Sequence, residues 1–569
     1  MQDVVSTPSR IGRGRLSVFG LRLRSEAPSL TDCGLAVTSA VLLILSFPDF
    51  NLWPLAWLGL VPLLVVVARS PQPWQTFLLG WLFGSIFFYG SCYWLTYSMI
   101  HFGGIPLLLA YVLLAPGAVL LGIFPGFFTI LLSRSIRRWG PTALFVAPIF
   151  WCALEWGRLQ ITGQLWNAVG YSQAYHPLLI QAARWGGVYA VGFWIVLVNS
   201  TLAYLFVRRQ KRVWVTSAII LLAIGGILLF PATLSKHDST SVVVSKPDVV
   251  VVAVQPNVPM EPVSDPTMTE ALITRHTSLS LSALQDWERN GRMDEAPAGS
   301  VDGDWPKDEI SRRAIPRLVI WPESPMNFAY GGDNHLRERL ASFAKTNNTS
   351  ILLNSQELAP NDGIYNSALL INQDGSLVAQ YDKIRLLPFG EYVPLPQWLP
   401  GASLISAIVG DFTPGTNYQL MPVGRIRAGV FICIESAYPA VARRFTREGA
   451  DVLINISNDG YLGPTAVMRQ HLANAIFRAV ENDRPLLSVT NTGITSFITP
   501  RGEAKDLTDG FKADVRTWNI ARTQRAQTFY TVHGDLFAGG CAILSLLIFM
   551  LSFKVQRKPW LPLLSVITE

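Results

Sequence analysis

Two kinds of hydrophobic pattern divide the chain. Seven long apolar runs lie before residue 236, and an eighth stands alone near the C-terminus. Between them, segment 236–533 carries short β-branched runs that alternate with polar and helical stretches. About 20 consecutive apolar residues can cross a bilayer as a helix, whereas short runs bounded by turn residues are typical of strands. The pattern predicts a membrane bundle that carries one large polar domain.

The long runs predict about eight transmembrane helices, several of them shorter than an untilted span requires. They lie at Gly34–Phe47, Leu52–Val67, Trp74–Ile100, Ile105–Leu132, Thr142–Trp156, Gly187–Phe206, Val213–Leu234 and Leu536–Phe553. The chain is 50% hydrophobic and only 15% charged, and its mean hydropathy is +0.31, a mixture typical of membrane proteins. Segment 157–186 is too polar to span and too aromatic for an ordinary loop. It predicts an interfacial or re-entrant segment, within which Trp166 and Tyr171 are candidate substrate contacts.

Basic residues cluster after every second run. The clusters are Arg69, then Arg134, Arg137 and Arg138, then Arg208, Arg209, Lys211 and Arg212, and finally Lys554, Arg557 and Lys558. With eight spans, all of them share one side with the basic N-terminal tail. The positive-inside rule makes that side cytoplasmic, so the polar domain is expected on the outer face. The net charge of +7 is explained by this orientation signal, and no nucleic-acid motif accompanies it.

The polar segment favours an α/β domain. Strands are expected at Val249–Val254, Arg317–Trp321, Ser350–Leu353, Ser367–Ile371, Leu377–Gln380, Arg427–Ile432, Asp451–Ile456, Leu486–Val489, Ser496–Thr499 and Gly502–Ala504. Helical periodicity is present at Glu270–Trp287, His335–Thr346 and Met468–Glu481. Buried strands with interleaved helices favour a sheet covered by helices. Residues 290–312 are polar and acidic, which predicts a surface insertion.

This organisation gives five predicted parts. They are a basic cytoplasmic tail (1–31), a transmembrane bundle with seven spans (32–235), a polar domain (236–533), an eighth transmembrane helix (534–554) and a cytoplasmic C-terminal tail (555–569).

One cysteine of the five lies inside the polar domain. Cys433 follows the apolar strand that ends at Ile432, so a sharp turn is expected to lift its thiol out of the sheet. A lone thiol forms no internal disulfide, and it is therefore either part of the core or a reagent.

Two other strands end on a reactive side chain. Glu323 follows Trp321-Pro322 just past a strand, where it is either a helix N-terminal carboxylate or a catalytic one. Lys383 and Glu391 flank an apolar loop broken by Pro388 and Gly390, although a lone lysine is more often solvated.

Thiol, carboxylate and lysine together suit acyl transfer. A thiol with a pKa near 8.5 is mostly protonated at neutral pH, so it needs a base. Glu323 can take the proton of Cys433, and the ammonium of Lys383 can stabilise the thiolate and then an oxyanion. The backbone N–H of Ile434, directly after the cysteine, is the natural second oxyanion donor.

The motifs resemble a known superfamily. Trp321-Pro322-Glu323, then Lys383 before Leu387-Pro388-Phe389-Gly390-Glu391, then a strand ending in Cys433-Ile434-Glu435, are similar to those of the nitrilase/carbon–nitrogen hydrolase superfamily. That resemblance implies a four-layer αββα sandwich with a Glu-Lys-Cys triad. The eight apolar runs and Pro-Phe-Gly-Glu-Tyr-Val-Pro narrow it to the bacterial apolipoprotein N-acyltransferase family.

The resemblance assigns roles by position. It implies Glu323 as general base, Lys383 as oxyanion-stabilising lysine and Cys433 as nucleophile, with Glu391 and Glu435 in support. Two departures from the family pattern are Ile434, where a tyrosine is usual, and Ser264, near the place of an expected tryptophan.

Further residues are candidates for substrate binding around the triad. Tyr392, Asn455 and Asn458 are expected to line the pocket, the two asparagines also as turn and capping residues. The apolar loop Leu395–Ile405, with Trp398 and Leu399, is either a lipid-contacting arm or a loop packed on its own domain. His471 is expected to make a helix-start contact, with a place in the active site as the alternative.

The resemblance implies an enzyme of the bacterial inner membrane with its catalytic domain on the periplasmic side. It would transfer an acyl chain from a glycerophospholipid, with phosphatidylethanolamine as the expected donor. The acceptor would be the α-amino group of a diacylglyceryl-cysteine apolipoprotein, reached through a thioester. No cofactor, metal or nucleic-acid partner is expected, and the expected state is a monomer. A membrane-tethered amidase that uses water is the alternative, and a non-enzymatic scaffold is disfavoured by the intact Glu-Lys-Cys set.

Overall fold

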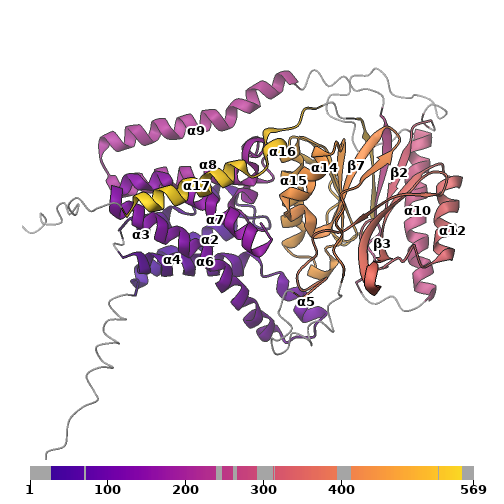
Figure 1. Cartoon of the computed structure of the whole chain (residues 1–569), viewed down its shortest axis with the longest axis horizontal. Helices are drawn as coiled ribbons and strands as arrows, with labels where there is room; N and C mark the ends of the chain where they lie inside the picture. The colour runs from indigo at the N-terminus through magenta and orange to yellow at the C-terminus, as the bar shows by residue number, and fades with distance from the viewer. Residues whose placement is uncertain are drawn as a thin grey trace, which may run out of the picture.

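The computed structural model describes residues 27–69, 72–238, 247–260, 266–290, 312, 314–393, 412–522 and 525–553. A helical bundle and an α/β domain lie side by side along the long axis (Figure 1). Every one of the eight apolar runs is helical. The helices of the bundle are α2 (Leu30–Ser46), η1 (Trp53–Trp57), α3 (Val61–Arg69), α4 (Pro73–Ser91), α5 (Leu95–His101), α6 (Leu107–Trp139), η2 (Pro141–Val146), α7 (Ala147–Thr162), α8 (Ala183–Arg208), α9 (Lys211–Asp238) and α17 (Leu536–Leu551).

Some of these helices have the length and apolarity of a membrane span. Among the described residues, two helices, α6 and α8, are long and apolar enough to cross a membrane. The bent pair α4 and α5, with an angle of 53° between them, makes a third if it counts as one span. Shorter apolar helices lie at Leu30–Ser46, Trp53–Arg69 and Leu536–Leu551. Eight spans therefore stay a prediction.

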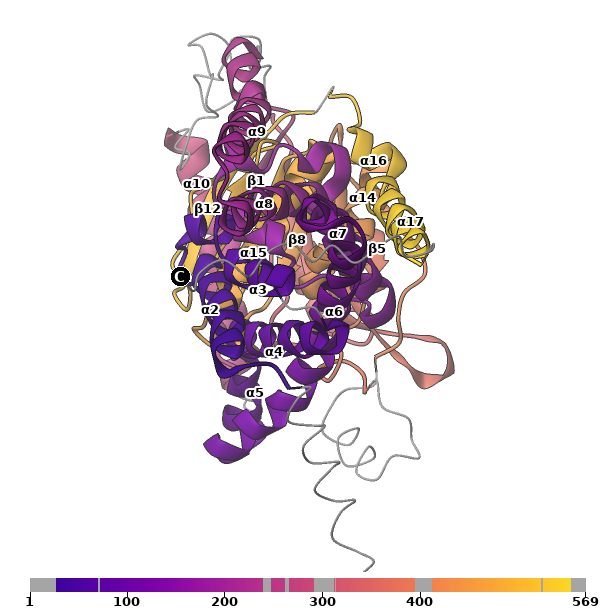
Figure 2. The ribbon, with the colours of Figure 1, turned by 90° about the vertical axis from the view of Figure 1, so that its left-hand side faces the viewer.

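Small residues bring α4 and α6 into close contact. A Cβ at Gly80 would lie 2.3 Å from Thr129 Oγ1, and one at Gly84 would lie 2.7 Å from Pro125 Cγ. Glycines four residues apart allow two helix backbones to approach, which is the usual way in which apolar helices associate in lipid. The last helix, α17, comes back from the α/β domain to pack on α7, and Figure 2 shows the bundle from its far end.

Two six-stranded sheets form the α/β domain. The first has the order β12-β1-β2-β3-β4-β5 and the second the order β11-β10-β9-β8-β7-β6. The strands are β1 (Val249–Gln255), β2 (Arg317–Ile320), β3 (Ser350–Leu358), β4 (Ile364–Ile371), β5 (Leu377–Asp382), β6 (Leu420–Val423), β7 (Ile426–Ile432), β8 (Val452–Ser457), β9 (Leu486–Thr490), β10 (Ser496–Ile498), β11 (Ala504–Lys505) and β12 (Asp514–Ile520).

The sheets face each other between two layers of helices. Alternate residues of β1 show this: Val249 and Val251 pack in the core shared with the second sheet, whereas Val252 and Val254 pack under the outer helices. The outer helices of the first sheet are α10 (Pro266–Asn290) and α12 (Asn334–Thr346), and those of the second are α14 (Pro439–Arg447) and α15 (Val467–Asn482). This is the expected αββα sandwich, and α15 lies on the bundle side of it (Figure 1).

All ten strands and three helices expected from the sequence are present. The pattern missed β6, α14, β12 and the short helix α16 (Phe529–His533). The sequences of α14 and β12 mix polar and apolar residues, and β6 is only four residues long and contains Pro422. β12 pairs antiparallel with β1 and closes the edge of the first sheet. Residues 1–26, most of the insertion 290–312, Ser264 and the C-terminal tail lie outside the described residues, as does the loop 394–411.

Segment 157–186 lies between the bundle and α15. It contains two short turns, η3 (Val169–Gln173) and η4 (Pro177–Leu179). The Tyr175 hydroxyl donates to the backbone oxygen of Arg469 (2.8 Å), and Arg184 forms an ion pair with Asp483 (2.8 Å). Because these partners begin and end α15, the segment fixes this helix against the bundle.

Candidate active site

The cysteine sits on a strained turn at the end of β7. Ile432 is the last residue of the strand, and Cys433 opens the 3-10 turn η6 (Cys433–Ala437). The φ of Cys433 is 50°, in the left-handed region that non-glycine residues rarely adopt. Such strain, of about 1–3 kcal/mol, is often found where a side chain must be presented to a substrate. The half-buried Cys433 thiol lies close enough to the Glu323 carboxylate for the two groups to interact electrostatically.

Lys383 lies between two carboxylates. Its Nζ is 2.9 Å from Glu391 Oε1 and 3.8 Å from Glu323 Oε1, and the lysine is only 1% exposed. Glu323 follows β2, Lys383 follows β5 and Cys433 follows β7. These three strand ends bring the residues together. The structure thus brings Glu323, Lys383, Cys433 and Glu391 together.

Asn366 completes this cluster and was not found from the sequence. Its Nδ2 donates to Glu323 Oε1 (2.9 Å) and to Glu391 Oε1 (2.8 Å). Its own Oδ1 accepts from Asn354 Nδ2 (2.7 Å), which fixes the orientation of the amide. A polar side chain on the buried face of β4 is the only sequence signal, and such a signal does not tell which groups the side chain contacts.

The protonation states follow from burial and neighbouring charge. Burial raises the pKa of the Cys433 thiol well above its usual value, and the nearby Glu323 carboxylate adds to this effect. Burial likewise raises the pKa of Glu323, although Lys383 opposes the shift. For Lys383, burial disfavours the charge, but Glu391 and Glu323 outweigh it and raise the lysine pKa. These shifts favour a thiol that keeps its proton, a carboxylate of increased basicity and a lysine that stays charged.

Glu435 ties the lysine loop to the cysteine turn. This fully buried carboxylate accepts from Tyr381 Oη (2.8 Å) and from the backbone N–H groups of Ile384 (2.9 Å) and Arg385 (3.0 Å). Its other oxygen accepts from the N–H of Ile432 (2.8 Å). Glu435 thereby fixes the distance between the segments that carry Lys383 and Cys433.

Two side chains hold the backbone carbonyl of Cys433. His471 Nε2 lies 3.0 Å from this oxygen, and Asn455 Nδ2 donates to it at 3.2 Å. His471 also contacts Asp459 Oδ1 through Nδ1 (2.8 Å). The histidine is thus in the active site region, through the backbone of Cys433 rather than through a helix-start contact.

The remaining expected substrate contacts have protein partners of their own. Asn458 Oδ1 accepts from Gly460, Asn491 and Thr492. Tyr171 Oη accepts from Arg478 (3.2 Å), and Trp166 Nε1 donates to Gln470 Oε1 (2.8 Å). Tyr392 is half-buried in the loop after Glu391.

Trp398 and Leu399 lie outside the described residues, so their expected lipid contact stays a prediction. The side chain of Ile434 is 8% exposed, and its position in the 3-10 turn is consistent with a role for the backbone N–H.

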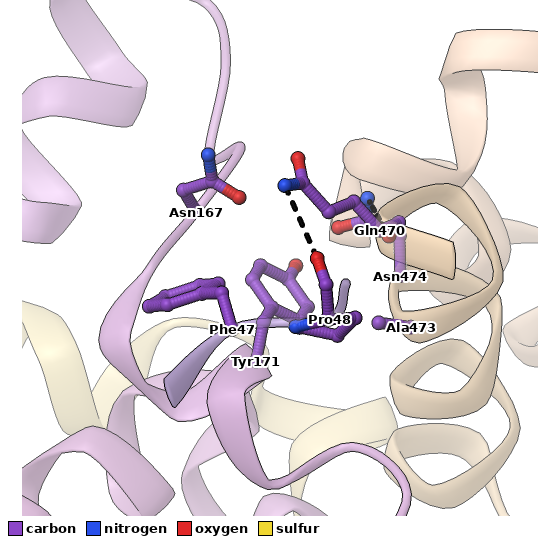
Figure 3. Close-up of a pocket in the computed structure, with 7 residues that line it drawn as sticks. All are labelled: Phe47, Pro48, Asn167, Tyr171, Gln470, Ala473 and Asn474. Atoms are coloured by element: carbon purple, nitrogen blue, oxygen red, sulfur yellow. Dashed lines mark hydrogen bonds between the residues drawn. The ribbon is translucent and has the colours of Figure 1, made fainter. Parts of the chain in front are cut away.

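A small pocket lies between the bundle and α15 (Figure 3). It is lined by Phe47, Pro48, Asn167, Tyr171, Gln470, Ala473 and Asn474. Gln470 Nε2 donates across it to the backbone oxygens of Pro48 (3.4 Å) and Ser91 (3.1 Å). Among the described residues, no group of three or more His, Cys, Asp and Glu side chains is arranged to hold a metal ion.

Comparison with known proteins identifies both halves of the chain. Residues 39–201 match the model of the apolipoprotein N-acyltransferase N-terminal domain, and residues 317–528 match that of carbon-nitrogen hydrolase. The apolipoprotein N-acyltransferase of Geobacter metallireducens is 31% identical over 531 residues, which cover 92% of this chain and 95% of that protein. The chain belongs to the apolipoprotein N-acyltransferase family.

A second relative agrees with this membership. The apolipoprotein N-acyltransferase of Pasteurella multocida is 27% identical over 548 residues, 93% of this chain and 96% of that protein. The crystal structure of Saccharomyces cerevisiae Nit3, a member of branch 10 of the nitrilase superfamily, is 17% identical and has a TM-score of 0.35, covering 51% of this chain and 95% of that chain. For an apolipoprotein N-acyltransferase family member, the Glu-Lys-Cys cluster is the candidate active site, and the sandwich carries the nitrilase-like α/β fold.

Proposed function

We propose that this protein transfers an acyl chain from a glycerophospholipid, with phosphatidylethanolamine as the preferred candidate, to the α-amino group of a diacylglyceryl-cysteine apolipoprotein. The observation that carries the proposal is the meeting of Cys433, Glu323 and Lys383 in one buried cluster. Family membership supplies the acceptor class. The reaction then has two halves, with a thioester on Cys433 between them.

In the first half, Cys433 attacks the ester carbon of the phospholipid. Glu323 takes the thiol proton as the S–C bond forms, because the raised pKa of the thiol leaves little thiolate at rest. The carbonyl oxygen becomes an oxyanion, which the Lys383 ammonium and the Ile434 N–H stabilise. The C–O bond then breaks, and Glu323 returns the proton to the leaving oxygen of the lysophospholipid.

In the second half, the α-amino group attacks the thioester. Glu323 now removes a proton from the attacking amine, and the same two donors stabilise the second oxyanion. Collapse of this intermediate breaks the C–S bond, and the sulfur regains its proton from Glu323. The products are an amide-linked acyl chain and the free enzyme.

A membrane-tethered hydrolase would use the same cluster with water as acceptor. The transferase interpretation is favoured by the relatives, which are named apolipoprotein N-acyltransferases. The burial of Lys383 and Glu391 would restrict water access and so protect the thioester until the amine arrives.

The proposal includes a location. Because both substrates carry acyl chains, a catalytic domain fixed to a bundle in the bacterial inner membrane would hold the triad near the lipid ester. By the positive-inside rule, the basic clusters favour residues 236–533 on the periplasmic side and residues 1–31 and 555–569 in the cytoplasm. Single cysteines introduced at Ser300 and Ser565, in a background where all five native cysteines are replaced by alanine, would test this: an impermeant maleimide should label the first and not the second in intact spheroplasts.

One experiment tests the chemistry. The purified protein is incubated with acyl-labelled phosphatidylethanolamine, and hydroxylamine-sensitive label on the protein is measured before and after addition of a diacylglyceryl-cysteine peptide. We expect label on the wild type, none on Cys433→Ala, and transfer to the peptide. Label that persists in Cys433→Ala would refute the nucleophile, and label that appears only as free fatty acid would favour the hydrolase.

A further inference from the structure

The carbonyl group of Cys433 is held from two sides. His471 on α15 contacts the oxygen through Nε2 at 3.0 Å, and Asn455 on β8 donates to the same oxygen at 3.2 Å. A carbonyl oxygen has two lone pairs, so these contacts use its whole accepting capacity. The nucleophile is therefore fixed through its backbone by two elements that lie outside the Glu-Lys-Cys cluster.

Holding this carbonyl also orients the next N–H. The peptide unit between Cys433 and Ile434 is planar and trans, so the N–H of Ile434 points away from the carbonyl and away from His471. Ile434 is the second residue of the 3-10 turn, where an N–H has no partner within the turn. Because Cys433 has a positive φ of 50°, the backbone alone does not favour this orientation.

The ring of His471 is held between two acceptors. Nδ1 lies 2.8 Å from the Asp459 carboxylate and Nε2 faces a carbonyl, so both nitrogens meet acceptors. Burial disfavours the charged ring, but Asp459 outweighs it and raises the pKa of His471. The place of Asp459 depends on Gly493, where a Cβ would lie 2.2 Å from Asp459 Oδ2.

We propose that His471, held by Asp459, is a positioning residue that fixes the Cys433–Ile434 peptide and thereby aims the Ile434 N–H at the oxyanion. The inference rests on the proposed function, in which Cys433 is the nucleophile. His471 is not itself a general base in this scheme, because neither ring nitrogen faces the thiol. The contacts among Glu323, Lys383 and Cys433 do not include the histidine. The proposed function and the positioning role can therefore be refuted independently of each other.

Two substitutions separate the two ring nitrogens. His471→Gln places an amide N–H near the position of Nε2 and can still donate to the Cys433 carbonyl. His471→Asn places its amide near Nδ1, next to Asp459, and cannot reach the carbonyl. Size, polarity and burial change similarly in both variants, so a purely structural role for the ring would affect them alike.

Two rates are measured on each full-length protein in detergent. The first is the single-turnover rate of thioester formation from labelled phosphatidylethanolamine at saturating donor. The second is the rate at which iodoacetamide alkylates Cys433, assigned by peptide mass against the Cys433→Ala background. Alkylation is a displacement at a saturated carbon and forms no oxyanion, so it reports only on the thiol and its access.

We expect His471→Asn to slow thioester formation about 100-fold, as loss of one oxyanion donor does, with donor affinity unchanged and alkylation within about 3-fold of wild type. His471→Gln should stay within about 5-fold of wild type in both rates. Equal losses in the two variants, a wild-type rate in His471→Asn, or a parallel loss of alkylation would each overturn the positioning role. If His471→Asn does not fold, Asp459→Asn replaces it, with an expected loss of about 10-fold in thioester formation alone.

The failure of the proposed function has a different signature. Label that forms equally on wild type and Cys433→Ala would show that Cys433 is not the nucleophile. If Cys433→Ala abolishes the label while His471→Asn reacts at the wild-type rate, only the positioning role is wrong.

Discussion

Two buried cations of the α/β domain sit next to carboxylates but in different ways. Lys383 in the candidate active site contacts Glu391 and Glu323, and Asn366 donates to both carboxylates. Arg478 on α15, at the contact with the bundle, pairs with Glu481 at 2.8 Å and is fully buried. There, Arg478 Nε and Nη1 and Glu481 Oε2 have no hydrogen-bond partner among the described residues.

The different surroundings of Lys383 and Arg478 indicate that the two cations have different roles. In the Lys383 cluster, the carboxylates of Glu323 and Glu391 each contact the Asn366 amide as well as the lysine, as expected where charge must be positioned for chemistry. Around Arg478 the remaining contacts join parts of the fold: Nη2 donates to Tyr171 Oη of segment 157–186, and Glu481 accepts from the N–H of Val188 at the break in α8. The first cluster should therefore control the rate and the second the stability.

Removing the cation of the active site tests the first half of this comparison. We expect Lys383→Met to lower acyl transfer by at least about 10³-fold, because the oxyanion loses its cationic partner. The unfolding midpoint should fall less than in the arginine variant below, since Asn366 still donates to both Glu323 and Glu391. The exposed Lys345→Met is the control, and an inactive Lys383→Met that is also largely unfolded would contradict the separation of roles.

Removing the cation at the bundle contact should have the opposite result. Arg478→Met leaves Glu481 buried without its partner, which costs about 3–5 kcal/mol of stability. The rate per folded molecule should stay close to wild type. Thermal unfolding in detergent, together with thioester formation normalised to folded protein, checks both expectations, with Arg447→Met as an exposed control.

The pH dependence of stability sharpens the same comparison. Burial raises the pKa of Glu481 from 4.5 to about 7, although Arg478 opposes the shift. A carboxyl whose pKa is higher in the folded state binds a proton more tightly there, so it stabilises the fold most below pH 4.5. That contribution should be lost as the pH rises from 4.5 to 7, by up to about 3 kcal/mol.

Glu481→Gln is the matched variant for this titration. Its unfolding midpoint should be flatter than that of wild type across pH 4.5–7, because the amide does not titrate. Parallel curves for the two proteins would show that Glu481 does not titrate in this range.

The smallest effect is expected where the two regions meet. Gln470, directly before His471, accepts from Trp94 Nε1 (3.1 Å) and Trp166 Nε1 (2.8 Å) in the bundle. Gln470→Leu leaves both indole N–H groups without this acceptor and should cost about 2 kcal/mol of stability. Thioester formation should fall by less than in His471→Asn.

The control for this last variant is Gln470→Glu, which keeps the acceptor for both indoles and should recover most of the stability. Activity lost together with stability in Gln470→Leu would indicate that the bundle contact, and not His471 alone, positions the nucleophile.

The sequence by itself determined the division into apolar helices and an α/β domain. Its signals are local: an apolar run in α6, the alternation of strands and helices, and strands such as β7 that end on a reactive residue. Glu323, Lys383 and Cys433 were found for the same reason, since each follows an apolar strand and lies in a recognisable motif. Elements with mixed patterns, such as β12, were missed because their burial depends on a neighbour.

Only the tertiary structure decided how these parts support each other. Asn366 reaches Glu323 across 43 positions of the chain, and His471 reaches the Cys433 carbonyl across 38. Gln470 joins α15 to Trp166 across 304. Such contacts arise from the pairing of the sheets and the docking of α15 on the bundle, and no local pattern specifies which polar side chains meet there. A strand that ends in cysteine can be predicted from the local sequence, but the groups that hold the cysteine in place are determined by tertiary packing.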